Sequence, residues 1–570
     1  MRIPLSLAGL TLALVLPSSA LAQFGAGGTP PGLDLGLAPT RAVELLPTPD
    51  VAALLAEDEL NADKVAPFRF GAGAEVSLGL EQGGEWLDLG DGRRLWRVRV
   101  ESPGAWSLNL VFDRYALPAG GELYVYNDAG VVLGAFDASL NQPHGFFATE
   151  PLAGDALTIE YVEPQDGPLG GLRLSEVIHA YRDILGQDAN AKASHGVSGL
   201  MKASGSCNIN VNCPLGASWQ DQKRSSARLV MGGVLCSGAL INNTANDSKQ
   251  YFLTANHCYN ASPNTGAWVF NFNYESATCN GTTGTAQSVS GATLRAKSTQ
   301  SDFCLVEINT DIPAQFGVYF SGWSRSTTAS TISTGIHHPQ GDIKKICQDD
   351  DSAIPANFNG APCWRVADWE QGVTEGGSSG SPLYDQNKRV VGQLFGGQAT
   401  CSFLFNDYYG RLDVSWNNGL SAFLDPIGSG AMALDGINDN QGGNPTTYCT
   451  GKISSQGLVP AIDFTGSASF AAQNLQLICA NGIPGSNGLY IQGVGQNNAP
   501  FFNATLCVLP PITRGPMGVF DVFGLMLNPI QITPAMIGTT RTYQYWGRDA
   551  AHPDGTGVIL SNALEVPFLP

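Results

Sequence analysis

The chain has 570 residues and a formal net charge of −19, with 49 acidic and 30 basic side chains. That charge argues against a nucleic-acid partner, because binding phosphates requires clustered Lys and Arg. The 69 glycines and 34 prolines indicate many turns between short strands. The length allows roughly three or four domains. We therefore predict an all-β protein with several domains.

The first 22 residues have the pattern of a signal peptide. Arg2 supplies the positive charge, residues 5–15 are apolar, and a small-x-small cleavage site ends at Ala22. We expect export to the extracellular space, with the periplasm and the cell surface left open. Twelve cysteines in an exported chain favour disulfides over metal ligands, and zinc-type spacing is missing. We expect neither a metal nor a cofactor.

The region before the first cysteine divides into a leader, a β domain and a polar linker. Residues 23–65 are rich in Gly, Pro and Ala, with one helix-like stretch at 51–60. Apolar and polar residues then alternate in short runs from about 68 to 182, which predicts a β-sandwich. Residues 183–206 form a polar linker that contains Lys192 and Lys202, and such segments are where processing occurs.

Short strands continue through 207–430, which holds nine cysteines. An Asn- and Gly-rich break at 438–444 separates this segment from a last β-patterned module. Residues 446–570 show no motif for chemistry. This module is a candidate for contact with a surface, a polysaccharide or secretion machinery.

Ser379 lies in a Gly- and Ser-rich turn, 375–384, that is suited to exposing a nucleophile. A serine needs a base to remove its proton and an acid to orient that base. His257 ends an apolar run, and Asp302 opens the apolar run 303–308. We therefore predict the catalytic set His257, Asp302 and Ser379. Each could singly be an ordinary core or turn residue.

Two motifs resemble those of chymotrypsin-fold serine proteases: 254–258, T-A-N-H-C, and 377–382, G-S-S-G-S-P. The segment also resembles the lysyl endopeptidase family of bacterial secreted proteases. The matching runs are 205–209, 242–247, 251–258, 301–302, 336–339, 372–375, 377–383, 388–394 and 409–411. The resemblance implies a chymotrypsin-like double β-barrel over 203–436. The 68–182 domain is similar to the propeptide that often precedes such proteases, so we expect a propeptide over 23–202. The part after the expected linker at 437–445 resembles a β-rich C-terminal module of large secreted bacterial proteins, so we expect a β-sandwich-like module over 446–570.

The resemblance implies a role for each site residue. Ser379 would attack the scissile carbonyl, His257 would carry the proton, and Asp302 would orient His257. The backbone N–H groups of Gly377 and Ser379 would form the oxyanion hole. His337 and His338 match a family run, and we expect them to be structural.

Specificity is predicted from three further positions. Val373 stands where trypsin-like enzymes carry their charge-reading acid, so that device is absent. The family uses an aspartate in a D-x-Y-G-R context, which Asp407 matches, and its carboxylate would pair with a basic substrate side chain. Phe395, beside Gly396, stands where the family often has His. We expect Lys to be preferred, with Arg or a broader choice as the alternative.

The resemblance also suggests disulfides and a maturation site. The pairs are Cys207–Cys401, Cys213–Cys279 and Cys236–Cys258, after which Cys347 and Cys363 would pair with each other. Cys304 is expected to be a buried thiol, and Cys449, Cys479 and Cys507 are unassigned. We expect a zymogen cut after Lys202, so that Ala203 becomes the new N-terminus.

Two classes of function follow from the sequence. The first is a secreted serine endopeptidase that acts on proteins or peptides with basic residues. The second is a secreted surface-binding protein with an inactive protease-like domain, which a complete triad disfavours. Peptidase activity that is lost in Ser379→Ala would separate the two.

Overall fold

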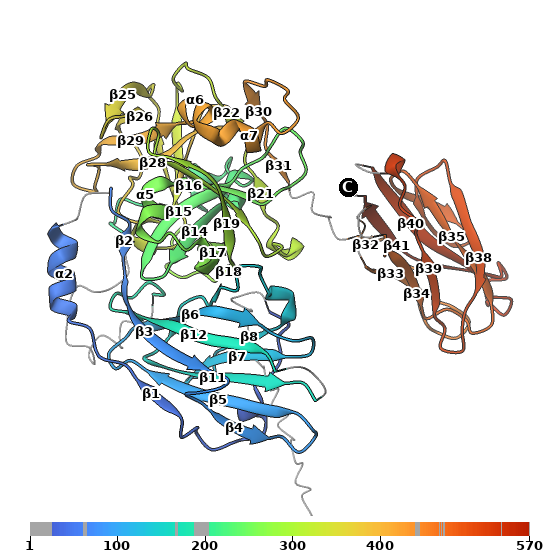
Figure 1. The fold of residues 1–570 in the computed structure, drawn as a ribbon. Coiled ribbons are helices and arrows are strands. Elements are labelled where there is room, and N and C mark those ends of the chain that lie inside the picture. The colour runs from blue at the N-terminus through green and yellow to red at the C-terminus, as the bar shows by residue number, and fades with distance from the viewer. Residues whose placement is uncertain are drawn as a thin grey trace, which may run out of the picture.

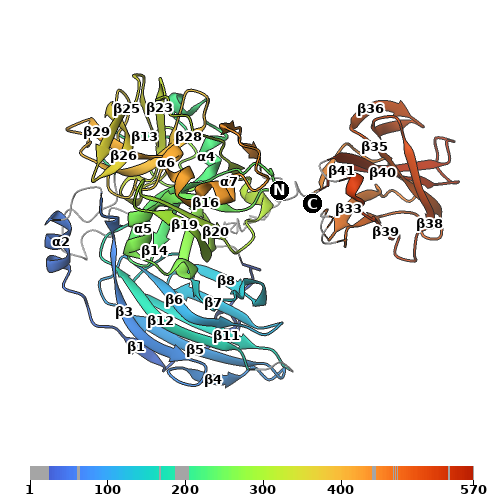
Figure 2. The same cartoon turned by 45° about the horizontal axis from the view of Figure 1, so that its top comes forward.

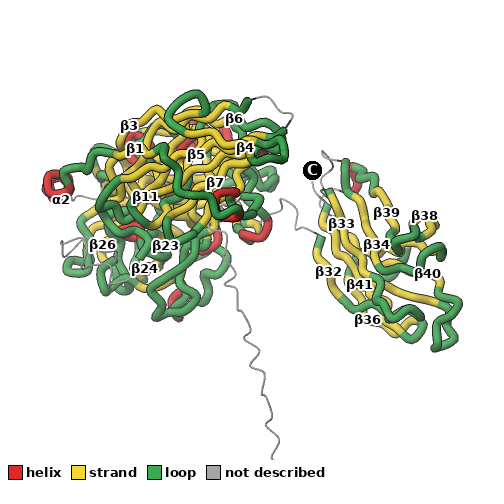
Figure 3. Tube along the Cα trace, turned by 90° about the horizontal axis from the view of Figure 1, so that it is seen from below, coloured by secondary structure: helices red, strands yellow, loops and turns green. Residues whose placement is uncertain are grey.

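We describe a computed structural model that covers residues 25–60, 65–165, 169–186, 204–438, 445–466, 468, 470, 473–536 and 539–568. The predicted signal peptide, Ala22, Lys202 and Ala203 lie outside these residues. Among the residues described, no helix is both long enough and apolar enough to span a membrane. Strands dominate the chain, and the few helices are short (Figure 3).

The N-terminal domain packs two sheets face to face, as predicted for a sandwich (Figure 1). In β5, Trp96 and Val98 point into the shared core, whereas Arg97 between them pairs with Glu160 on the other face. The first sheet comprises β1 (Val43–Leu45), β5 (Arg94–Glu101), β11 (Ala156–Glu163), β7 (Glu122–Asn127), β8 (Val132–Phe136) and β4 (Glu85–Asp88). The second comprises β10 (Leu152–Ala153), β6 (Ser107–Ala116), β12 (Gly171–Ala180), β3 (Gly71–Gly79) and β9 (Phe147–Ala148).

The stretch predicted as a leader is partly built into this domain. β1 pairs in parallel with β5, and the Gly32 N–H donates to the buried Glu160 carboxylate (2.9 Å). Helix α1 (Pro31–Asp34) lies at this contact, and α2 (Val51–Leu60) covers the predicted helical stretch. The leader therefore adds an edge strand, which composition alone did not indicate.

Two larger antiparallel sheets follow, with the arrangement of the chymotrypsin-like double barrel (Figure 2). Each sheet encloses its own cluster of buried apolar side chains, and side chains from both sheets form a third cluster. The first sheet is β18 (Gln287–Ser290), β17 (Trp268–Phe272), β14 (Ser226–Met231), β15 (Val234–Leu240), β16 (Tyr251–Ala255), β20 (Phe303–Ile308) and β19 (Ala292–Ser298). The second is β13 (Ile209–Asn210), β24 (Lys345–Asp349), β23 (Ser333–His337), β27 (Pro382–Tyr384), β28 (Val390–Gly397), β29 (Phe405–Arg411), β26 (Ala361–Asp368) and β25 (Ile354–Phe358), with β22 (Trp323–Ser324) and β30 (Ala433–Leu434) at its side.

Short helices and turns connect these strands. Ile437–Asn438, which we assigned to the linker, forms β31 and pairs with β21 (Tyr319–Phe320). The helices are α4 (Gln222–Ser225), α5 (Asn256–Ala261), α6 (Leu412–Ser415) and α7 (Ser421–Leu424). The single turns are η1 (Ala138–Leu140), η3 (Pro214–Gly216), η4 (Thr265–Ala267), η5 (Ala314–Phe316), η6 (Pro339–Gly341), η7 (Trp416–Leu420) and η8 (Pro534–Met536).

The N-terminal region contributes a strand to the first barrel sheet. β2 (Phe68–Arg69) pairs antiparallel with Val234 and Leu235 of β15, although the sequence placed 68–69 in the sandwich. Buried apolar side chains from both domains form one cluster beside this pairing. Arg228 of β14 donates to the carbonyl of Ile184, which ends the N-terminal domain (2.9 Å). The two domains are therefore joined by a sheet, a core and a buried hydrogen bond.

The C-terminal module, orange to red in Figure 1, packs a five-stranded sheet against a three-stranded one, with a two-stranded hairpin beside them. Its disulfide joins Cys449 to Cys507, and Cys479 is a buried thiol. The strands are β32 (Thr446–Tyr448), β41 (Val558–Pro567), β40 (Thr540–Arg548), β35 (Asn487–Gly493), β38 (Thr513–Val519), β33 (Ala461–Thr465), β34 (Gln476–Ala480), β39 (Met526–Pro529), β36 (Gln496–Phe501) and β37 (Ala504–Val508).

Candidate active site

His257 and Asp302 are in direct contact. His257 lies in the first turn of α5, and Asp302 precedes β20 with a left-handed φ of 54°, which Asp tolerates better than most residues. The carboxylate lies 2.7 Å from Nδ1 of His257 and accepts the His257 backbone N–H at 2.9 Å. The Asp302 carbonyl also accepts the N–H of Asn256 (2.8 Å). These contacts fix the imidazole with Nδ1 toward the acid, as a general base requires.

The electrostatics of this pair combine two opposing effects. Burial raises the pKa of the Asp302 carboxyl above its ordinary 3.8, and the contacts with His257 act in the opposite direction. The Asp302 side chain is 3% exposed, so its charge is screened little by water. A carboxylate held there favours a positive charge on the imidazole during proton transfer.

Ser379 comes from the second barrel, in a turn shaped by two glycines. Gly377 has φ +89° and Gly380 has φ +80°, and a Cβ on Gly377 would lie 3.1 Å from the His338 carbonyl. The turn is tied to the first barrel, because the Ser237 N–H donates to the Ser379 carbonyl (2.8 Å). Ser379 itself is 0% exposed.

His337 and His338, which we predicted to be structural, support this turn. Nδ1 of His337 lies 2.7 Å from Oγ of Ser378, and that oxygen accepts the Glu375 N–H (3.1 Å). Nδ1 of His338 lies 2.9 Å from the Asp342 carbonyl, and burial lowers the pKa of His338 well below 6.5. No sequence signal indicates the His337–Ser378 contact, because the two residues meet only across β23 and the serine turn.

Asp407 is a fully buried carboxylate on β29. β29 pairs with β28, the strand that carries Phe395. Asp407 accepts hydrogen bonds at its Oδ2 from Nε1 of Trp369 (2.8 Å) and from Oγ1 of Thr374 (2.6 Å). It pairs with Gly397 of β28, where an added Cβ would lie 2.1 Å from Oδ1 of Asp407. Sequence reasoning missed Trp369. It did include Thr374, within the family run 372–375, without giving it this role.

Phe395 connects the histidine to an aromatic cluster. Its ring stacks on His257, with 6.0 Å between the centroids and 19° between the planes. It also contacts Phe358 edge-on at 5.2 Å, and Phe358 stacks on Tyr408, the partner of Gly396 across the sheet. An apolar ring over the imidazole restricts access of water to this side of the site.

The N-terminal region packs beside the same groups. Val65 packs against the buried cluster that contains Phe395. Phe68 lies next to Gly376, three residues before Ser379, with a Cβ at Gly376 3.5 Å from its ring. A cavity of about 470 Å³ is lined jointly by 66–69 and by Gly376. Residues 65–69 thus pass along the site from the aromatic cluster to the serine turn.

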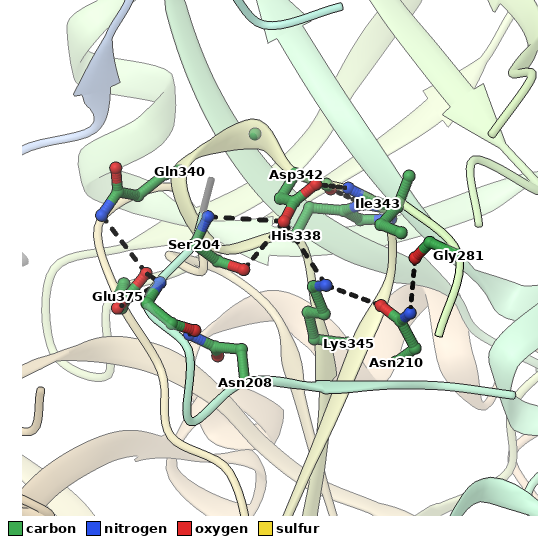
Figure 4. A network of polar contacts seen from close by, with 12 residues as sticks. Ser204, Asn208, Asn210, Gly281, His338, Gln340, Asp342, Ile343, Lys345 and Glu375 are labelled. Atoms are coloured by element: carbon green, nitrogen blue, oxygen red, sulfur yellow. Dashed lines mark hydrogen bonds and ion pairs between the residues drawn. The ribbon is translucent and has the colours of Figure 1, made fainter. Parts of the chain in front are cut away.

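The start of the predicted mature domain also contacts the segment that leads into the serine turn (Figure 4). Oγ of Ser204 donates to the Asp342 carboxylate (2.8 Å), and the Gly205 N–H donates to both oxygens of the Glu375 carboxylate (3.1 Å each). Gln340 also donates to Glu375 (3.3 Å). The residues that follow the predicted cleavage point are therefore bound to the segment that leads into Ser379.

Three of the predicted disulfides are present: Cys207–Cys401, Cys213–Cys279 and Cys236–Cys258. The last ties α5, which carries His257, to β15. Cys304 is a buried thiol, as predicted.

The predicted Cys347–Cys363 bond is wrong, since both residues are buried thiols. Cys347 points into the second-barrel core together with Trp364 and Val366. Cys363 precedes Trp364 in β26, so it faces the opposite side, where Phe395 lies.

The two barrels, with His257 and Asp302 from one and Ser379 from the other, define the class: the chain is a chymotrypsin-like serine endopeptidase. The family pattern "Lysyl endopeptidase, C-terminal domain" matches residues 201–410. A lysyl endopeptidase of Pseudomonas aeruginosa is 30% identical over 358 residues, covering 57% of this chain and 74% of that protein. The chain belongs to the lysyl endopeptidase family.

Solved structures also match, at low similarity. The protease domain of MamO from Magnetospirillum magneticum has a TM-score of 0.26 and 13% identity, over 36% of this chain and 100% of that one. A serine endoprotease from Yersinia pestis has a TM-score of 0.25 and 13% identity, over 36% and 64%. Scores this low carry no weight for the fold, which rests on the sheets above.

Proposed function

We propose that this enzyme is exported and hydrolyses peptide bonds after basic residues, with Lys preferred. The observation that carries the specificity is Asp407, a buried carboxylate held by Trp369 and Thr374. Thr374 lies five positions before the candidate nucleophile Ser379, so the acid and the serine are joined by one short segment. A buried carboxylate in apolar surroundings pairs strongly with a substrate cation.

The preference for Lys over Arg follows from how Asp407 is bound. Oδ2 of Asp407 accepts the hydrogen bonds from Trp369 and from Thr374. A guanidinium binds a carboxylate best through both oxygens, and here it would share Oδ2 with two donors already in place. An ammonium is a compact point charge and needs only one oxygen. Lys therefore fits this carboxylate at lower cost than Arg.

In the proposed mechanism Ser379 attacks the scissile carbonyl while Nε2 of His257 removes its proton. Asp302 holds the imidazole through Nδ1 and stabilises the imidazolium. The N–H groups of Gly377 and Ser379 stabilise the oxyanion, and His257 then protonates the leaving amine. A water molecule, activated by the same histidine, hydrolyses the acyl-enzyme and restores Ser379.

Asp407→Asn tests the specificity, because Asn keeps the shape and can still accept from Trp369 and Thr374. We expect kcat/KM on Lys peptides to fall roughly 100-fold to 1,000-fold, the equivalent of about 3–4 kcal/mol for an unpaired buried charge. Cleavage of a peptide library would measure it, with the exposed Asp311→Asn as control. Unchanged Lys selectivity in Asp407→Asn would refute the assignment.

We also propose that the chain is made as a zymogen and cut after Lys202. The burial of Ser379 and the passage of 65–69 along the site support a closed precursor. The contacts of Ser204 with Asp342 suggest that a new amine at Ala203 would bind the same carboxylate and order the serine turn. N-terminal sequencing of active enzyme should begin at Ala203, and Asp342→Asn should be processed yet weakly active. Full activity with a start at Gln23 would refute this.

The alternative from another class, a binding protein with an inactive protease-like domain, is disfavoured by the His257–Asp302 contact. It predicts no peptidase activity after maturation and no difference between the natural chain and Ser379→Ala. Contact of the C-terminal module with a surface or polysaccharide is compatible with either function and stays a prediction.

A further inference from the structure

Three carboxylates gather in the second barrel, away from the catalytic pair. Asp349 ends β24, Asp351 follows two residues later, and Glu370 lies just beyond the end of β26. Each offers an oxygen, and these oxygens lie within 4.8 Å of one another. The two segments are held together at this point by a backbone bridge between Gln348 and Gln371 (Gln348 N–H to Gln371 carbonyl, 2.8 Å). The cluster is therefore placed by the fold of the barrel and not by one loop.

Asp349, the buried member of the cluster, provides the main evidence about what the cluster binds. Asp349 is 1% exposed, and its Oδ1 accepts the Asp351 N–H at 2.7 Å. Its Oδ2 is buried as well, yet it has no hydrogen-bond partner among the residues described. A buried carboxylate oxygen without a donor or a cation is costly, so native proteins rarely retain one without a reason. The side of the cluster formed by Asp351 and Glu370 is exposed to solvent.

The surroundings of Asp349 add to this cost. Carboxylate oxygens of Asp351 and Glu370 lie within 4.8 Å of an oxygen of Asp349, so negative charges on the three groups repel one another. A bound cation would remove this repulsion.

We propose that Asp349, Asp351 and Glu370 bind a calcium ion. The donors are all carboxylate oxygens, which suit hard divalent cations and not the softer metals that prefer nitrogen or sulfur. Two of the three residues face water, so solvent can complete the coordination sphere. Calcium accepts irregular arrangements of six to eight oxygens, whereas magnesium requires near-ideal octahedral geometry.

The position of the site gives it a function that rests on the proposed specificity. Glu370 directly follows Trp369, whose Nε1 binds Asp407, and the same segment continues to Thr374, the other donor to Asp407. The Asp350 N–H also donates to Glu370 (3.0 Å). An ion bound to Glu370 would hold this segment against β24. Calcium would thus hold in place the residues that position the Asp407 carboxylate, which binds the basic side chain of the substrate.

Binding is tested on the full chain carrying Ser379→Ala, which cannot cut itself. Millimolar calcium should raise the melting temperature by several degrees, because the ion binds the folded state. Terbium should show luminescence sensitised by Trp369, which calcium displaces. In Asp349→Asn and in Asp351→Asn both responses should disappear, whereas the exposed Asp311→Asn should keep them. No calcium response in the parent chain, or an equal response in the two site variants, overturns the proposal.

Asp349→Asn also controls for misfolding. It removes a buried charge while keeping an oxygen for the Asp351 N–H, so its melting temperature without calcium should equal or exceed that of the parent. In matured active enzyme, removing calcium with EGTA should raise KM for Lys peptides several-fold with a smaller change in kcat. Calcium binding with an unchanged KM refutes the link to Asp407 alone. An inactive enzyme refutes the proposed function, and the binding measurements still decide the site.

Discussion

The contact between the N-terminal domain and the first barrel should be stronger at acid pH than at neutral pH. Glu150 of the N-terminal domain is buried against the barrel, where its carboxylate accepts from Oγ of Ser288 (2.7 Å). Burial raises the pKa of Glu150 from 4.5 to about 7, although the bond from Ser288 and the charge of Arg228 oppose the shift. Once the domains separate, Glu150 returns to water and to its ordinary pKa.

The sign and the size of the pH effect on docking follow from these two pKa values of Glu150. A carboxyl whose pKa is raised in the docked state binds more protons there, so docking is strongest below pH 4.5 and weakens as the pH rises to about 7. A shift of this size corresponds to on the order of 3 kcal/mol, or roughly a 300-fold change in Kd. His144, at the same interface, acts in the opposite sense, because burial lowers its pKa below 6.5 and acid would charge it.

The assay uses the Ser379→Ala chain with a specific cleavage site placed between residues 187 and 203 of the predicted linker. After the cut, the Kd of the two parts is measured between pH 4.5 and 8. Glu150→Gln should bind with little pH dependence above pH 6, whereas the exposed Glu81→Gln should follow the parent. A Kd that does not increase between pH 5 and pH 8, or an identical profile in Glu150→Gln, would show that Glu150 does not control docking.

Three further outcomes are expected. Asp302→Asn should lower kcat by about 10⁴-fold with little change in KM, as steady-state kinetics would show, because the histidine loses its tautomer control. Gly397→Ala should lower the rate of Lys-peptide cleavage more than the stability of the fold, since the added Cβ would lie 2.1 Å from Oδ1 of Asp407. An equal loss of activity on uncharged substrates would contradict this. Replacing Cys236 and Cys258 by Ser should cost about 2–4 kcal/mol in urea unfolding, and no change in the midpoint would argue against a stabilising bond.

Much of the candidate site was predictable because its signals are local in sequence. The turn around Ser379 requires glycines at fixed offsets, and the run 254–258 places the histidine at the end of a buried strand. Asp302 was found by its position before an apolar strand, and the structure brings it against His257. Alternating apolar residues likewise predicted the strands of the N-terminal sandwich, such as β5 and β11.

Other features arise only when distant segments meet. The sequence placed 68–69 in the sandwich, but they pair with the first residues of β15, which β16 does not reach. This pairing uses backbone hydrogen bonds, which carry no residue signature. The predicted Cys347–Cys363 bond fails because the alternation along β26 turns Cys363 to the face opposite the cluster that holds Cys347.

The sequence by itself determined the class of enzyme and indicated the candidate nucleophile, base and carboxylate in their order, because each of these groups needs a recognisable local setting. Tertiary structure alone decided what surrounds them. Burial made Asp407 an anchored charge, left Oδ2 of Asp349 without a donor among the described residues, and moved the pKa of Glu150 to about 7. Desolvation and charge pairing depend on which surfaces meet in space, and residue order along the chain does not specify that.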